Sequence, residues 1–160
     1  MNHRISAFTL VETILYLALF NIIFFSVITW AITLTQSNRN AEYRNAIEKN
    51  AIFVTEHLSD TFRRGRTVVE DESSFHTGQG SVRISTDSDY FDYNVQNQRL
   101  RVNRNGGTFL LTDPFVQVTE FRVQPVRNEG EILGVRVRIT FIAEKYPSVT
   151  KTIESYYAFR

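Results

Sequence analysis

The sequence predicts an α+β fold in which one long N-terminal helix packs on an antiparallel β-sheet head domain. Three observations support this prediction. Residues 13–38 form a run of 26 positions without a charged side chain. Residues 39–64 then place apolar side chains on one helical face, and from Thr67 onward apolar residues alternate with polar ones. A chain of 160 residues has room for one such domain with an appendage.

The uncharged run is long enough to cross a membrane. Its central 21 residues, 14–34, would span about 31 Å as a helix, close to the hydrocarbon thickness of a bilayer. The core helix of a soluble protein rarely runs so far without a charge. The apolar region of a secretory signal peptide is normally shorter and ends at a small-x-small site, whereas this run ends near Trp30, a residue type common at membrane interfaces. A retained membrane helix is the better prediction.

A single acidic residue, Glu12, stands at the start of the apolar run. A carboxylate costs about 2–3 kcal/mol at the centre of a membrane helix and less near the interface, so it usually has a partner. A short polar leader, residues 1–7, lies before Glu12 and carries Arg4. The charge at the edge of the membrane segment is therefore a candidate functional group.

The residues that lead to this carboxylate form a motif. In order they are Ala7, Phe8, Thr9, Leu10, Val11 and Glu12. The motif resembles the N-terminal signature of the type IV pilin and pseudopilin superfamily: a short basic leader and a small residue, then Phe-Thr-Leu-(Ile/Val)-Glu opening a long apolar helix. The resemblance covers residues 1–35. The chain departs from the family at Ala7, where glycine is usual, and in having no proline within the helix.

The resemblance implies a processing step. Prepilin peptidase would cleave between Ala7 and Phe8 and would methylate the new amine of Phe8. Glu12 would form the assembly salt bridge with that amine, in its own chain or in a neighbouring subunit. The alternative for Glu12 is an interfacial carboxylate without a special partner. The implied organisation is a leader (1–7), a transmembrane and assembly helix (8–35), and an amphipathic helix with an antiparallel β head domain (36–160).

The segment after the membrane run predicts an amphipathic helix over residues 39–64. Its apolar stripe consists of Ile47, Ala51, Val54, Leu58 and Phe62, spaced by three or four residues. Asp60 and Arg64 form an i, i+4 pair on the polar face. Basic residues near Arg64 suit a helix C-terminus, and Gly65 is the expected stop.

The alternating segments predict half-buried strands. Their apolar residues are Val82 and Ile84; Phe91, Tyr93 and Val95; Leu100 and Val102; and Val135, Val137, Ile139 and Phe141. Residues 150–157 are expected to form the last strand. Together these segments indicate one antiparallel sheet of roughly six to eight short strands, packed on the apolar stripe of the helix.

Turn signals separate the strands. Residues 97–98 (Asn-Gln) and 105–107 (Asn-Gly-Gly) predict hairpin turns. The apolar phase shifts within residues 116–126, so we expect a β-bulge near Thr119 or Glu120. Pro125 favours an edge strand or a strand end. The polar loop 71–80 is the expected mobile segment.

The sequence offers little for catalysis. It has no cysteine, which excludes disulfides, Cys-ligated metals and thiol chemistry. It lacks a Gly-rich phosphate loop, a G-x-S-x-G motif and a histidine pair at i, i+4. We therefore expect a protein that is not an enzyme and has no cofactor.

Two charged groups have alternative interpretations. Asp87, Asp89 and Asp92 form an acidic cluster that is a weak calcium candidate, because calcium prefers oxygen-rich loops. The alternative is a turn whose Asp side chains bond the backbone. Eight arginines of the predicted strand region could form a DNA-uptake surface. However, residues 67–160 carry 11 basic and 12 acidic side chains, so DNA binding is not expected and a solvated sheet face is the better interpretation.

The resemblance implies a minor pilin or pseudopilin, closest in layout to the J-type minor subunits of type II secretion. It would be a single-pass protein of the inner membrane, with a cytoplasmic N-terminus and a periplasmic or extracellular head, before incorporation at or near a filament tip. Its partners would be prepilin peptidase, membrane lipid, the inner-membrane assembly platform and other subunits. The alternatives are a DNA-uptake or adhesive tip pilin and a membrane-anchored enzyme outside the cytoplasm.

Overall fold

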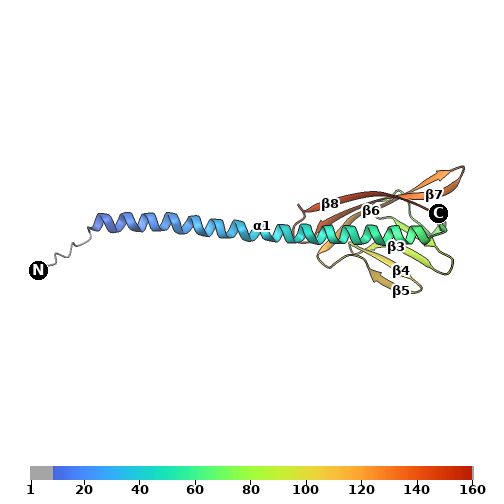
Figure 1. Ribbon diagram of the computed structural model, residues 1–160, viewed down its shortest axis with the longest axis horizontal. Helices are drawn as coiled ribbons and strands as arrows, with labels where there is room; N and C mark the ends of the chain where they lie inside the picture. Colours follow the sequence, from blue (N-terminus) through green and yellow to red (C-terminus); the bar gives the residue numbers. More distant parts are fainter. Residues whose placement is uncertain (1–8, 160) are drawn as a thin grey trace, which may run out of the picture. The chain divides into compact units, whose positions relative to one another are not determined.

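The computed structural model describes residues 9–159. Contacts divide the chain into two compact units, Met1–Arg39 and Asn40–Arg160. One helix, α1 (Leu10–Arg64), begins in the first unit and ends in the second (Figure 1). Neither glycine nor proline interrupts its 55 residues. The strands of the second unit lie against the C-terminal half of this helix, which confirms the predicted α+β fold class.

The strands follow the helix in two groups. In the described part of the chain they are β1 (Thr67–Val68), β2 (Ser81–Ser85), β3 (Tyr90–Gln96), β4 (Arg99–Arg104), β5 (Gly107–Leu110), β6 (Val116–Asn128), β7 (Glu131–Ala143) and β8 (Thr150–Ala158). A 3₁₀ helix, η1 (Glu70–Glu72), lies between β1 and β2. All strand pairs within the two sheets are antiparallel, as predicted.

The prediction of one sheet of short strands was wrong in two respects. The strands form a five-stranded sheet in the order β1-β2-β3-β4-β5 and a separate three-stranded sheet in the order β6-β7-β8. In addition, β6 and β7 are each 13 residues long. Alternation shows which residues face the core, but it does not show which strands pair, because the same pattern fits either arrangement.

The turns and irregularities agree closely with the sequence. Asn97 and Gln98 both have positive φ angles, 53° and 59°, as a two-residue hairpin turn requires. Asn105 and Gly106 do the same in the next hairpin, and the second Gly of the predicted turn already belongs to β5. The register of β6 shifts between Val118 and Glu120, where the bulge was predicted.

The end of α1 depends on a close packing contact. The N–H of Gly65 donates to the carbonyl oxygen of Thr61 at 2.8 Å, and the helix ends at Arg64 as predicted. A Cβ atom at position 65 would lie 2.6 Å from Cγ2 of Ile84 on β2. Glycine is therefore required here because the strand approaches the helix end, and not because of a positive φ angle.

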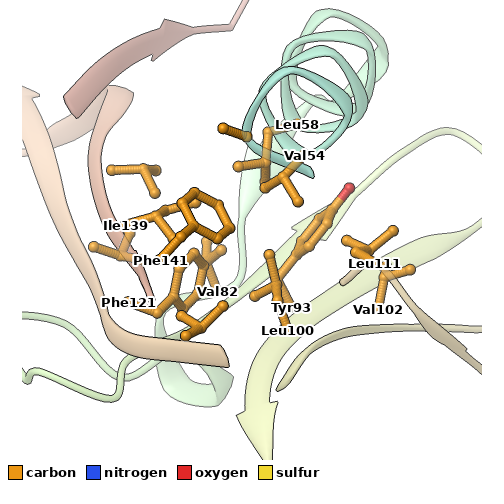
Figure 2. Close-up of a cluster of buried hydrophobic side chains, with 14 of the residues drawn as sticks. Val54, Leu58, Val82, Tyr93, Leu100, Val102, Leu111, Phe121, Ile139 and Phe141 are labelled. Atoms are coloured by element: carbon orange, nitrogen blue, oxygen red, sulfur yellow. The ribbon is translucent and has the colours of Figure 1, made fainter. Parts of the chain in front are cut away.

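The hydrophobic core lies between the helix and both sheets. All five residues of the predicted stripe are buried: Ile47, Ala51, Val54, Leu58 and Phe62. Figure 2 shows Val54 and Leu58 of α1 beside Tyr93 and Leu100 of the first sheet, and Phe121 and Phe141 of the second. The ring of Phe62 also stacks on Tyr157 of β8, with centroids 5.1 Å apart. One core thus holds the helix and the two sheets together.

The loop predicted to be mobile connects the two sheets through its backbone. Gln79 forms an isolated parallel bridge with Phe121 of β6, and the N–H of Gly80 donates to the Phe121 carbonyl oxygen at 2.7 Å. A Cβ atom at position 80 would lie 2.8 Å from the Ser74 carbonyl oxygen and 3.0 Å from that of Phe121. The N–H of His76 also donates to the Val123 carbonyl oxygen. These bonds fix residues 76–80 on β6.

Candidate functional site

The first candidate site is the apolar N-terminal part of α1. It includes an 18-residue stretch with a mean hydropathy of 2.2, none of whose residues is buried, so the helix is long and apolar enough to span a membrane. Large apolar side chains are exposed at positions such as Leu17, Phe20 and Ile22. An exposed apolar helix of this length is consistent with a single-pass membrane anchor.

The polar side chains of this segment bond to their own helix. The amide of Asn21 donates to the carbonyl oxygen of Leu17 at 2.9 Å. Four hydroxyl groups likewise donate to the carbonyl oxygen four residues earlier, those of Ser26, Thr29, Thr33 and Thr35. Because each of these groups has an acceptor within the helix, it can be accommodated in hydrocarbon at reduced cost.

The start of the helix holds the described part of the motif. The hydroxyl of Thr9 accepts a hydrogen bond from the backbone N–H of Glu12 at 3.3 Å, which is N-cap geometry. This bond uses the backbone of Glu12 and not its carboxylate, which is half-exposed in the first turn. Leu10 and Val11 are exposed on the same turn. The predicted cleavage and methylation positions, Ala7 and Phe8, lie outside the described residues.

In the second unit, Asn50 connects the helix to the loop before β6. Its side chain is 4% exposed. The amide Nδ2 donates to a carboxylate oxygen of Asp113 at 2.9 Å, and the backbone N–H of Asp113 donates to Asn50 Oδ1 at 2.8 Å. The same Nδ2 group donates to the Ala46 carbonyl oxygen. This reciprocal pair fixes the loop against the helix.

A second polar network joins the helix to β3. The Thr61 hydroxyl donates to the His57 carbonyl oxygen at 2.9 Å, so it accepts from the Tyr93 hydroxyl at 2.6 Å. The Tyr93 oxygen in turn accepts from Nδ1 of His57 at 2.9 Å, which assigns the Nδ1–H tautomer. Burial raises the pKa of Tyr93. Partial burial also lowers the pKa of His57 below its ordinary 6.5, against the opposing charge of Asp60. These hydrogen bonds hold β3 against the C-terminal part of α1.

The three aspartates of the calcium candidate are each engaged by a different arginine. Asp87 accepts from Arg66 at 2.7 Å, Asp89 from Arg104 at 2.7 Å, and Asp92 lies 3.5 Å from Arg83. The hydrogen bond from Arg66 lowers the pKa of Asp87, and the bonds from Arg104 and Asn105 lower that of Asp89. Within residues 9–159, no three His, Asp or Glu side chains are grouped so that they could hold a metal ion.

Comparisons with known proteins add no relative. No protein-family model, curated protein or solved structure matches this chain. The long N-terminal apolar helix and the antiparallel head are consistent with a pilin-like fold.

Sequence reasoning missed two kinds of polar residue. The pattern Thr9-x-x-Glu12 is the start of a capping box and could have located the helix N-terminus. Asn50 and Tyr93 gave no such signal, because their partners lie 63 and 36 residues away in the chain. Contacts over these distances depend on the tertiary fold, which local patterns do not encode.

Proposed function

We propose that this protein is a minor pilin or pseudopilin, a structural and non-enzymatic subunit of a type IV pilus or a type II secretion pseudopilus. Prepilin peptidase removes residues 1–7 and methylates the amine of Phe8. The subunit then waits in the inner membrane with its head outside the cytoplasm. The assembly platform adds it to a filament, at or near the tip, where it contacts other subunits.

One observation supports this proposal above the others. The motif at residues 7–12 leads into a helix whose apolar side chains are exposed and whose Ser, Thr and Asn side chains bond to their own backbone. Such a helix can bury its apolar side chains only against something outside the chain. Lipid and the helices of other subunits can both cover them. A filament packs these helices together, so the same surface serves both states.

In this proposal, the charge of Glu12 sets the axial position of one subunit relative to its neighbour. Cleavage after Ala7 creates a cation at the edge of an apolar segment. The new amine would lie four residues before Glu12 in the sequence, so the two charges could pair within one chain or between neighbouring subunits. In surroundings of low dielectric constant their attraction is much stronger than that of a surface ion pair. Pairing between chains would therefore favour one axial register.

Mass spectrometry of the protein from its own membrane tests the processing step. The expected mature N-terminus is Phe8, carrying one methyl group. Replacing Ala7 by Gly, the usual family residue, should leave cleavage intact, whereas Ala7→Leu should block it because the site requires a small residue. A fully functional protein that retains residues 1–7 would refute the proposal.

Glu12 variants test the assembly step. Glu12→Ala and the isosteric Glu12→Gln remove the charge and should leave membrane insertion intact while reducing incorporation into sheared filaments. Glu12→Asp keeps the charge and is the matched control. Unchanged incorporation of Glu12→Gln would show that the predicted ion pair does not guide assembly.

A further inference from the structure

The solvent-facing side of the β6-β7-β8 sheet concentrates positive charge. In the antiparallel register, Arg122 of β6 lies directly opposite Arg138 of β7. Arg136, two residues along β7, lies opposite Gln124. Directly opposed side chains have Cβ atoms about 4.5–5.5 Å apart, and like charges in such positions are destabilising. A sheet that keeps three neighbouring cations therefore needs anions to balance them.

The carboxylates on this face of the sheet balance the charge of only two of the three arginines. Glu154 of β8 accepts from Nη2 of Arg138 at 2.7 Å, and its other oxygen lies 3.8 Å from Nε of Arg136. Glu120 lies 3.2 Å from Nε of Arg122 and accepts from the Thr140 hydroxyl. Three guanidinium groups thus share two carboxylates, which leaves one excess positive charge.

Arg122 has an unused donor at this position. Its Nε atom is buried and makes no hydrogen bond, because the contact with Glu120 is an ion pair without hydrogen-bond geometry. The side chains surround a cavity of about 130 Å³, which we call the arginine pocket; its residues are Arg122, Gln124, Arg136, Arg138 and Glu154. Water occupies about 30 Å³ per molecule in the liquid, so the pocket has room for a small oxyanion and its hydration water.

Three arginines elsewhere in the head are each paired with one carboxylate. Arg66 makes two hydrogen bonds to the carboxylate of Asp87, and Arg127 makes two to Glu70. Arg104 likewise donates twice to Asp89. Arg99 and Arg101 of β4 donate to neutral acceptors, the Pro114 carbonyl oxygen and Gln96. The three arginines of the β6-β7-β8 face differ from these in surrounding a cavity that a small anion can enter.

We propose that the arginine pocket binds one carboxylate, supplied by an acidic side chain of a neighbouring subunit. The excess of one positive charge matches one monoanion, and the planar guanidinium fork matches the geometry of a carboxylate. All three arginine side chains are between 41% and 57% exposed, so a partner can reach them. The identity of the donor as a filament subunit rests on the proposed function, whereas the carboxylate site does not.

Titration of the full chain in a non-ionic maltoside detergent tests the site, with acetate as the probe. Sodium acetate replaces sodium chloride at constant ionic strength, and NMR follows the arginine Nε–H resonances. Acetate should shift the Arg122 resonance saturably, with a millimolar dissociation constant. Arg138→Gln should weaken acetate binding about tenfold, since it removes a charge-assisted hydrogen bond. A linear response without saturation would overturn the site.

Arg101→Gln is the matched control. Arg101 lies on β4 of the other sheet and also has a buried Nε atom without a hydrogen bond, but it lies outside the arginine pocket and its Nη1 atom donates to Gln96. This change should leave acetate binding unchanged, and equal weakening by Arg101→Gln and Arg138→Gln would overturn the site. Far-ultraviolet circular dichroism checks that each variant is folded.

Two further probes separate the ligand classes. Inorganic phosphate and a short single-stranded oligonucleotide replace acetate in the same titration. Binding of either at least about tenfold tighter than acetate would overturn the carboxylate assignment in favour of a phosphate group. The mature N-terminus, measured on the same sample, distinguishes the two proposals. Acetate binding with residues 1–7 retained would refute the filament subunit alone, and loss of acetate binding with Phe8 processed would refute the arginine pocket alone.

Discussion

The two halves of α1 form one continuous helix, but their side chains contact different surroundings. Within residues 10–35, large apolar side chains are exposed and hydroxyl and amide groups bond to the carbonyl oxygen one turn earlier. Within residues 40–64, an apolar stripe is buried, and Asn50 and His57 reach side chains of other elements. The apolar side chains of the first half can be buried only against lipid or another protein. Those of the second half are buried against the strands of the same chain.

This difference shows how one helix can serve two environments without a break. The halves differ in charge, since residues 13–38 carry no charged side chain and residues 40–64 carry eight. Their polar groups differ as well: the amide of Asn21 bonds within the helix, whereas that of Asn50 also bonds across the fold. Substitutions of matched residues in the two halves should therefore have very different effects on head stability.

The largest contrast is expected for leucine. Leu58 is fully buried in the head core, so Leu58→Ala should lower the free energy of unfolding by about 2–5 kcal/mol. Leu17 is 63% exposed, and Leu17→Ala should leave head stability unchanged. Urea unfolding in maltoside, followed by the near-ultraviolet dichroism of the tyrosines, measures both. Equal losses would show that the apolar half is packed on the head.

The next contrast uses asparagine. Asn50→Ala should cost about 1–3 kcal/mol, because it leaves the Asp113 backbone N–H and carboxylate without their partner. Asn21→Ala removes only a bond to the Leu17 carbonyl oxygen, so the same unfolding measurement should change by about 0.5 kcal/mol or less. A small change in unfolding free energy for Asn50→Ala would mean that the loop before β6 keeps its position without the hydrogen bonds from Asn50.

A smaller effect is expected from pH. Because burial lowers the pKa of His57 below 6.5, the unfolded chain binds more protons just below this pH than the folded one. Head stability should therefore decrease as the pH falls through 6.5 toward the folded pKa, and be fully present above it. His57→Asn keeps a donor near the Tyr93 hydroxyl and should flatten this dependence. An unchanged slope in the variant would assign the dependence to other groups.

The smallest effect is expected for threonine in the apolar half. Thr29→Val replaces a hydroxyl that bonds only to the Phe25 carbonyl oxygen, so head stability should change by less than about 0.5 kcal/mol. Thr61→Val is the positive control, because it removes the partner of the buried Tyr93 hydroxyl. Comparable losses of head stability from the two changes would contradict this division of α1, in which polar groups of the first half bond within the helix and those of the second half bond to other elements.

Local patterns in the sequence were sufficient for the elements but not for their pairing. The stripe from Ile47 to Phe62, the hairpin at Asn97 and the bulge beside Glu120 each depend on neighbouring residues, and each was predicted. The division into two sheets depends on which strands meet across the fold. The arginine pocket was missed for the same reason, since the opposition of Arg122 and Arg138 exists only in the β6–β7 register.

Acidic residues close in sequence proved a poor guide to a site. Asp87, Asp89 and Asp92 looked like an oxygen-rich loop, yet each is paired with an arginine from another part of the chain. The sequence places the carboxylates but cannot show that Arg66 and Arg104 reach them. Clusters of one charge therefore need the positions of the opposite charges before they indicate a metal.

At Gly80 three stretches of backbone meet so tightly that only a hydrogen atom fits in place of a side chain. Residues on the strand faces can change size at an ordinary packing cost, because rotamers and neighbours adjust. A methyl group at position 80 has no such relief, since it would lie 2.8 Å from the Ser74 carbonyl oxygen and 3.0 Å from that of Phe121. The loop before β2 therefore limits how closely it lies against β6 at this point, and a larger residue at position 80 would have to push its backbone away from Phe121.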